Sequence, residues 1–309
     1  MQAARQLDGS RTRPAAPRRV ADRVPAQGWF VVSAVFHYLG PAFAVLLFAR
    51  VEVLGVAWLR IATAGLVLAV WRRPWRRWAG LDLRTRRLVV TWGAVLAAMN
   101  SCFYLAIDRL PLGTVAAVEF VPVLALAALG ARTRRNGAAL VLAAAGVALL
   151  TEVRLVQDPV GVLFAVANAA LFAAYVVLGH RVAGGAAAEG DSEGIDGIDG
   201  LALSMAVALL VALPVGLRDA VPALTDPALL AAAVGVGVAS SVVPYVCDQL
   251  AMARLARATY SLMLALLPAT ATVVGVLVLA QLPSVKEVAG VALVVGGVAV
   301  HRPPARTSS

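Results

Sequence analysis

The apolar residues of this chain are gathered into ten runs separated by short polar or charged segments. A helix that crosses the hydrocarbon core of a bilayer needs about 20 apolar residues, so each run predicts a membrane-spanning helix. The shortest run begins at Gly137, and we expect its helix to be extended, tilted or met by a thinned bilayer. The runs are residues 28–48, 52–71, 88–107, 112–130, 137–151, 160–179, 201–217, 228–249, 258–280 and 285–301.

Composition supports this interpretation and excludes other protein classes. The 309 residues are 61% apolar and 14% charged, against about 45–50% and about 25% in soluble proteins. This excess of apolar residues argues against a soluble globular protein, a disordered chain and a disulfide scaffold. The net charge of +10 comes from basic residues that lie almost entirely between the apolar runs, so they indicate membrane topology and no nucleic-acid partner.

The distribution of basic residues predicts the orientation in the membrane, because positively charged flanks resist translocation. With the N-terminus inside, the cytoplasmic segments hold 21 Lys and Arg residues and the outer loops hold five. Both termini are therefore predicted in the cytoplasm. Trp71, Trp75 and Trp78 cluster where the second helix is expected to leave the membrane, which is typical of an interfacial aromatic belt.

Two blocks in the first half of the chain match blocks in the second half. The first block matches at an offset of 145 residues and pairs Arg109 with Arg254, and the second matches at an offset of 151 and pairs Gly146 with Gly297. Each half then holds five helices, so the second copy enters the membrane from the opposite side. The result is a pair of inverted repeats related by a pseudo-two-fold axis, an architecture of alternating-access transporters.

The predicted organisation follows from the runs, the repeat and the charge pattern. The acidic, glycine-rich segment before Gly200 lacks the ligand spacing of a calcium loop and is interpreted as a flexible hinge. The predicted parts are a disordered cytoplasmic tail (1–27), a first five-helix repeat (28–151), the sixth helix (152–181), a flexible cytoplasmic loop (182–200), the remainder of the second repeat (201–302) and a short tail (303–309).

Three segments carry a resemblance to a known family. They are LRIATAGLVLAVWRRPWR (Leu59 to Arg76), RLPLGTVAAVEF (Arg109 to Phe120) and SVVPYVCDQLAMARLARATYSLMLALLPA (Ser241 to Ala269). These segments resemble the EamA branch of the drug/metabolite transporter superfamily, and within it the threonine/homoserine exporters. The resemblance implies a ten-helix exporter of amino acids or related metabolites that is driven by the proton gradient.

Ionisable residues are rare inside the runs, because each costs about 2.5–3.5 kcal/mol to insert. Arg60 and Glu119 each lie eight residues from the outer end of their predicted helices, or about 12 Å deep at the rise of an α-helix. We expect them at the same depth. They either form an ion pair that orders the bundle or flank a site for the carboxylate and ammonium of an amino acid.

Other residues within the runs are candidates for more specific roles. His37 is a candidate for proton coupling together with Glu119, although a hydrogen-bonded packing histidine is an open alternative. Asp248 and Arg254 are candidates for a cytoplasmic gate, and Pro122 and Pro268 for paired helix breaks near the binding region. The polar candidates for substrate binding, besides Arg60 and Glu119, are Asn100, Tyr104, Tyr175 and Tyr245.

The sequence therefore predicts an all-α polytopic protein of the bacterial cytoplasmic membrane that exports a small metabolite by alternating access. Alternatives are an exporter of drugs or other metabolites, a facilitator, and an integral membrane enzyme. No GxSxG, HExxH, Walker or CxxC motif is present in the sequence, so no catalytic residue, metal or cofactor is predicted. The expected partners are a small-molecule substrate, protons and lipid, and the sequence leaves the oligomeric state open.

Overall fold

The computed structural model describes residues 24–130, 133–155, 158–188, 195, 197–252 and 266–300, and these residues contain helices and connections but no strands. The helices are α1 (Ala26–Leu47), α2 (Val53–Arg72), α3 (Trp75–Trp78), α4 (Leu83–Ile107), α5 (Leu112–Gly130), α6 (Arg134–Leu155), α7 (Pro159–Ala188), α8 (Gly197–Thr225), α9 (Pro227–Gly237), η2 (Val238–Val242), α10 (Val243–Met252), α12 (Leu266–Leu279) and α13 (Val285–Val300). The prediction of an all-α chain is confirmed for this part.

Six helices among the described residues are long and apolar enough to cross a membrane. They begin at Gln27, Val53, Leu83, Pro159, Gly197 and Pro227. Helix α6 has 22 residues, so the helix at the short run that begins at Gly137 extends beyond the run at both ends. The total of ten spans and their orientation stay predictions.

One long helical stretch changes its winding in the middle. Residues Val238–Val242 form a π-helical segment, η2, between α9 and α10, and the N–H of Val243 donates to the carbonyl of Val238. Such segments are rare and are frequently found at functional sites. Pro244 follows directly and has no N–H, so the carbonyl of Ser240 receives no hydrogen bond from the residue four positions later.

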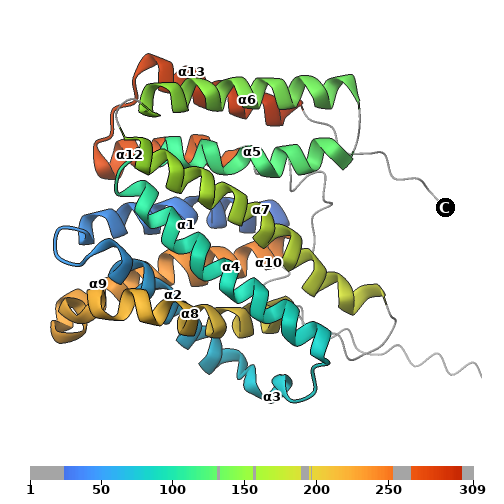
Figure 1. Cartoon of the computed structure of the whole chain (residues 1–309), viewed down its shortest axis with the longest axis vertical. Helices are drawn as coiled ribbons and strands as arrows, with labels where there is room; N and C mark the ends of the chain where they lie inside the picture. Colours follow the sequence, from blue (N-terminus) through green and yellow to red (C-terminus); the bar gives the residue numbers. More distant parts are fainter. Residues whose placement is uncertain are drawn as a thin grey trace, which may run out of the picture.

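The helices pack in a pattern that repeats between the two halves of the chain. Helix α2 packs along α8, α6 along α13, and α5 along α12. Helix α4 packs against α7 as α1 packs against α10, and α5 contacts α7 as α1 contacts α12. Figure 1 shows α6 and α13 together at one end of the molecule and α2 and α8 near the other, with the remaining spans between them.

Small residues allow the closest of these helix approaches. A Cβ atom added to Gly146 on α6 would lie 2.6 Å from the carbonyl oxygen of Gly290 on α13, and one added to Gly297 would lie 2.6 Å from the carbonyl oxygen of Ala139. Any side chain at either glycine would push the two backbones apart. This close approach is the packing mode that membrane helices use when lipid removes the hydrophobic driving force.

The predicted flexible loop at 182–200 is shorter than expected. Helix α7 continues to Ala188 and α8 begins at Gly197, so helices occupy both ends of that segment. Residues 189–194 and 196 lie outside the described residues. The helices extend because alanine and glycine, which made the segment look like a linker, are also compatible with helices when neighbouring helices pack against them.

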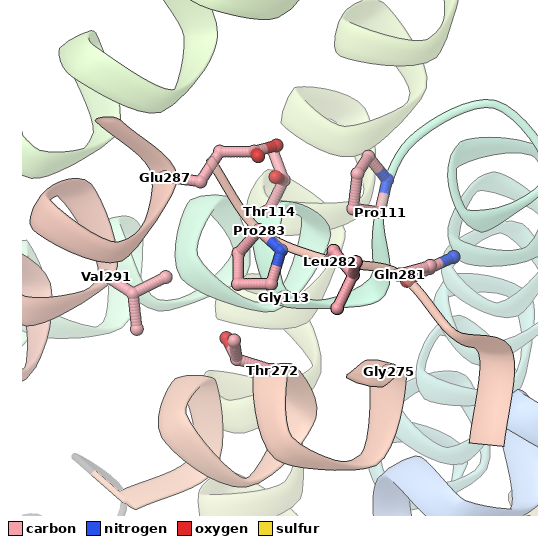
Figure 2. Close-up of a pocket in the computed structure, with 10 residues that line it drawn as sticks. All are labelled: Pro111, Gly113, Thr114, Thr272, Gly275, Gln281, Leu282, Pro283, Glu287 and Val291. Carbon is pink, nitrogen blue, oxygen red and sulfur yellow. The ribbon is translucent and has the colours of Figure 1, made fainter. Parts of the chain in front are cut away.

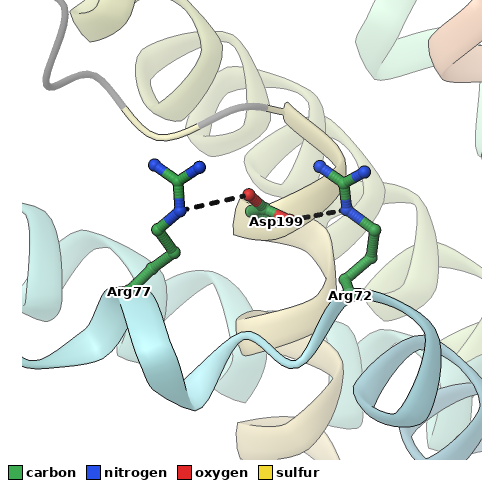
Figure 3. Close-up of polar contacts among 3 residues, drawn as sticks. All are labelled: Arg72, Arg77 and Asp199. Carbon is green, nitrogen blue, oxygen red and sulfur yellow. Dashed lines mark hydrogen bonds and ion pairs between the residues drawn. The ribbon is translucent and has the colours of Figure 1, made fainter.

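Asp199 belongs to this segment and anchors the start of α8. Its carboxylate is buried and lies 2.6 Å from Nε of Arg72 and 3.9 Å from Nε of Arg77. Figure 3 shows the two arginines reaching the carboxylate from both sides, Arg72 from the end of α2 and Arg77 from α3. The end of α2, the short helix α3 and the start of α8 are thereby tied together.

Candidate functional site

A cavity lies among six helices drawn from both halves of the chain, and most of the side chains that line it are buried. Helices α1, α2, α4 and α5 of the first half and α7 and α10 of the second half each contribute side chains to its wall. The cavity is lined by His37, Arg60, Met99, Asn100, Phe103, Glu119, Asn168, Phe172 and Tyr245.

Arg60 contributes the cation of this cavity and is 4% exposed. Its Nε donates to Oγ of Ser241 at 2.7 Å, and its Nη2 donates to the carbonyl of Ser240 at 2.8 Å. That carbonyl is the one that Pro244 leaves without its helical donor. The guanidinium carbon also lies 5.3 Å from the centre of the Tyr104 ring, in cation–π geometry. Arg60 is therefore held on two sides while Nη1 makes no hydrogen bond to another described residue.

Glu119 contributes the anion and is likewise 4% exposed. Its Oε1 accepts a hydrogen bond from Nδ2 of Asn168 at 3.1 Å. Among the described residues, no ion pair within 4.0 Å joins Glu119 to Arg60. The two charges nevertheless line the same cavity. The expectation that they share one depth in the membrane stays a prediction, and a direct ion pair between them is absent from the described residues.

A close backbone approach fixes the position of the η2 segment against α1. A Cβ atom added to Gly40 would lie 2.6 Å from both Cα and N of Ser240. On the same face of α1, Oγ of Ser33 donates to the carbonyl of Pro244 at 3.2 Å. Glycine at position 40 thus lets α1 press the π-helical segment toward Arg60, which sets where the guanidinium can lie.

Aromatic rings form the wall on the other side of the cavity. The His37 ring lies edge-on to Tyr245 with centroids 6.3 Å apart, and Tyr245 lies 6.2 Å from Tyr175. Tyr175 stacks on Trp92 and on Phe172. The cavity lining therefore holds one cation and one carboxylate together with the amides of Asn100 and Asn168 and with apolar and aromatic side chains.

Comparison with known proteins extends this description. Residues 159–301 match the model of the EamA-like transporter family. The chain is 31% identical over 245 residues to a protein of Salmonella typhimurium (strain SL1344) named threonine/homoserine exporter RhtA, covering 78% of this chain and 79% of that protein. It is 32% identical over 247 residues to the protein of the same name in Escherichia coli (strain K12), with the same coverage. The chain belongs to the EamA-like transporter family. Together with the six long apolar helices, this membership makes it a multi-pass membrane transporter.

A solved crystal structure supports the fold of this EamA-like chain. It superposes with a TM-score of 0.53 at 20% sequence identity and covers 88% of this chain and 96% of its own. At that identity the similarity concerns the arrangement of helices. The match covers most of both chains, so it reaches beyond the second half that the family model recognises.

Some of the polar residues predicted for substrate binding line the cavity, and others contact the residues that line it. Asn100 and Tyr245 line the cavity with Arg60 and Glu119. Tyr104 lies behind Arg60, and Tyr175 lies behind Tyr245. His37, the predicted proton-coupling candidate, lines the cavity on α1.

The predicted gate and helix breaks have different surroundings. Asp248 accepts a hydrogen bond from Oγ of Ser33 at 2.5 Å, and its predicted partner Arg254 lies outside the described residues.

Helix α5 continues through Pro122, so this proline does not interrupt the helix. Pro268 lies near the described start of α12, where its carbonyl accepts from Oγ1 of Thr272 at 2.9 Å. The local change in winding that the structure shows is at η2.

The sequence pattern missed two residues of the site, Ser240 and Ser241, which hold Arg60. Asn168, which holds Glu119, stands out in the sequence as one polar residue on an apolar helix, able either to line a cavity or to bond a neighbouring helix. Hydroxyl side chains within apolar helices carry no charge signal, so the spacing of the serines alone did not assign them to the site. The serine pair four and three residues before Pro244 was nevertheless a usable signal, because a proline inside a helix frees a carbonyl that needs a new donor.

A second cavity lies between α5, α12 and α13 and contains none of the predicted site residues. Figure 2 shows the Glu287 carboxylate and the Thr114 hydroxyl pointing toward one another across it. Gln281 accepts the N–H of Leu112 at 3.1 Å, and the side chains of Ser284 and Glu287 cap the start of α13 reciprocally. These bonds tie α5 to the connection before α13 and have a structural explanation.

Proposed function

We propose that this EamA-like protein is a secondary transporter that exports a small amino acid or a close derivative across the bacterial cytoplasmic membrane. One observation carries the proposal: Arg60 and Glu119, which are both buried, line one cavity without pairing with each other. Leaving two opposite charges buried and apart is costly unless each finds another partner. An amino-acid zwitterion supplies both partners in a single molecule.

The hydrogen bonds already made by Arg60 favour this mode of binding. Because Nε and Nη2 are engaged by Ser241 and Ser240, the guanidinium is held in place and Nη1 remains for a substrate carboxylate. Glu119 is the group that accepts the substrate ammonium. The relatives named threonine/homoserine exporters support the amino-acid class for this chain.

The proposed architecture is ten membrane-spanning helices in two inverted repeats, 28–151 and 152–302, with both termini in the cytoplasm. The contact between α6 and α13 supports this relation. The repeat offset of 151 residues pairs Ala139 with Gly290 and Gly146 with Gly297, and the two closest approaches are Gly146 with Gly290 and Gly297 with Ala139. When each residue is replaced by its repeat partner, the contact of Gly146 with Gly290 becomes the contact of Gly297 with Ala139. A pseudo-two-fold axis requires this correspondence.

The transport cycle is proposed to alternate access to the cavity and to be coupled to protons. Glu119 and His37 are the titratable candidates, because both line the cavity where a proton and a substrate compete for the same space. Asp248, with Arg254 as its proposed partner, remains the candidate for a gate. The contact from Ser33 to Asp248 supports that role, because it links α1 to α10.

Efflux of labelled amino acids from preloaded cells tests the proposed function. Cells that produce the protein and cells that lack it are loaded with threonine or homoserine, and loss of label is followed with and without an agent that collapses the proton gradient. We expect faster loss that depends on the protein and on the gradient. Equal loss from both cell types for every amino acid tested would contradict the proposal, and faster loss that ignores the gradient would contradict proton coupling.

A further inference from the structure

Asn168 on α7 has a buried polar atom that the protein itself does not satisfy. The residue is 0% exposed and lines the cavity. Its Nδ2 donates to Glu119, whereas its Oδ1 has no hydrogen-bond partner among the described residues. Buried polar atoms are nearly always paired, so an unpaired acceptor in a cavity calls for a donor from elsewhere.

The orientation of this amide follows from the chemistry of its neighbour. While Glu119 is ionised, its carboxylate accepts hydrogen bonds and donates none, so the amide nitrogen of Asn168 faces Glu119. Arg60 does not supply a donor to the amide oxygen, because the described hydrogen bonds of Arg60 go to Ser240 and Ser241. Two of the residues that line the cavity thus contribute acceptors, one charged and one neutral.

We propose that Asn168 is a substrate-positioning residue: its side-chain carbonyl and the carboxylate of Glu119 together accept two N–H groups of a primary ammonium on the transported molecule. This inference rests on the proposed function and assigns the ammonium end of the substrate to a specific pair of residues. A primary ammonium has three N–H donors and satisfies both acceptors at once. A tertiary ammonium has one N–H and satisfies a single acceptor.

The different number of N–H donors on primary and tertiary ammonium groups distinguishes a direct contact by Asn168 from a merely structural role. If Asn168 only orients Glu119, its loss weakens every ligand that binds Glu119 by the same factor. If Asn168 touches the ammonium, its loss weakens primary ammonium ligands selectively. The ratio of two affinities, measured on one variant, therefore decides between the roles without depending on how much transport remains.

The experiment uses the purified full-length protein in liposomes and measures exchange of labelled L-threonine. Unlabelled L-threonine and N,N-dimethyl-L-threonine compete with the label. The variants are Asn168→Leu, which removes both the donor and the acceptor, and Asn168→Asp, whose protonated form keeps a donor toward Glu119 and an acceptor toward the cavity. Ser204→Ala is the matched control, because Ser204 is buried and donates to the backbone of Val89, outside the cavity lining.

We expect the preference of the wild type for threonine over its dimethyl derivative to fall roughly ten- to hundredfold in Asn168→Leu, the range expected for one hydrogen bond to a charged group. We expect Asn168→Asp and Ser204→Ala to keep the preference. Asn168→Ala takes the place of the leucine variant if that protein does not fold. An unchanged preference in Asn168→Leu, or in Asn168→Ala where it replaces the leucine variant, would overturn this inference and leave the proposed function standing. Wild-type liposomes that exchange neither threonine nor homoserine would overturn both.

Discussion

Replacing Arg60 separates the role of its charge from the role of its planar shape. Arg60→Met removes the charge and both hydrogen bonds, to Ser241 and to the Ser240 carbonyl. Arg60→Lys keeps the charge on a single nitrogen. That nitrogen can bond the serines or face the cavity, but it cannot reproduce the fork that does both.

The size of each effect follows from the contacts. A hydrogen bond from a charged group contributes about 1.5–3 kcal/mol, and Arg60 makes two of them. Inserting an arginine at mid-membrane costs about 2.5–3.5 kcal/mol, and methionine avoids this cost. The two terms largely offset each other, so we expect Arg60→Met to change the free energy of unfolding by no more than about 3 kcal/mol. Transport should nevertheless fall at least about tenfold in both variants, because the substrate carboxylate loses its fixed donor.

Two assays on the same preparations check this reasoning. Thermal unfolding in detergent reports stability, and exchange of labelled threonine in liposomes reports transport. We expect folded variants with little exchange, and a lower affinity for threonine in Arg60→Lys than in the wild type. Wild-type exchange in both variants would refute the assignment of the carboxylate to Arg60. Exchange that falls only in proportion to lost folded protein would refute it as well.

Substitutions at four further positions test the packing of the helices. Gly40→Val should separate α1 from η2, lower the unfolding temperature and reduce exchange, since its side chain would overlap Ser240. Gly146→Leu should lower the unfolding temperature by parting α6 from α13, whereas exchange per folded molecule should change less. Asp199→Asn should destabilise the protein by about 1–3 kcal/mol, because it leaves the guanidinium of Arg72 without its carboxylate. Gln281→Ala should cost about 1–3 kcal/mol by leaving the N–H of Leu112 without its acceptor, and Gln281→Glu should restore the stability. Thermal unfolding measures each change. An unchanged unfolding temperature in Gly40→Val, Gly146→Leu, Asp199→Asn or Gln281→Ala would contradict the contact that the substitution tests.

Hydropathy and charge predicted the elements well, because a bilayer demands long apolar helices and penalises buried charge. The all-α class, the apolar helices and the presence of Arg60 and Glu119 inside apolar helices were all accessible in this way. The repeat offset paired Gly146 with Gly297, whereas the structure places Gly146 against Gly290 and Gly297 against Ala139. The features that were predicted depend on single residues or on short stretches of the chain, which can be recognised in the sequence directly.

Other features depend on contacts that local patterns do not display. The amphipathic signal is weak where all faces of a helix are apolar, so the partner of each polar side chain could not be assigned. Asp199 looked like part of an acidic linker, yet it is buried between Arg72 and Arg77. Asn168 looked like one polar residue among several, and only the packing of α7 against α5 brings it to Glu119.

The most direct test of the central claim compares Glu119→Gln with Glu287→Gln in liposomes that exchange labelled threonine. Both glutamates are buried, but Glu119 lines the central cavity while Glu287 caps α13, a role that glutamine also fills. We predict that Glu119→Gln folds and abolishes exchange, and that Glu287→Gln exchanges threonine as the wild type does. Wild-type exchange by Glu119→Gln would contradict the account, because the cavity would then bind its substrate without the carboxylate on which the proposed site depends.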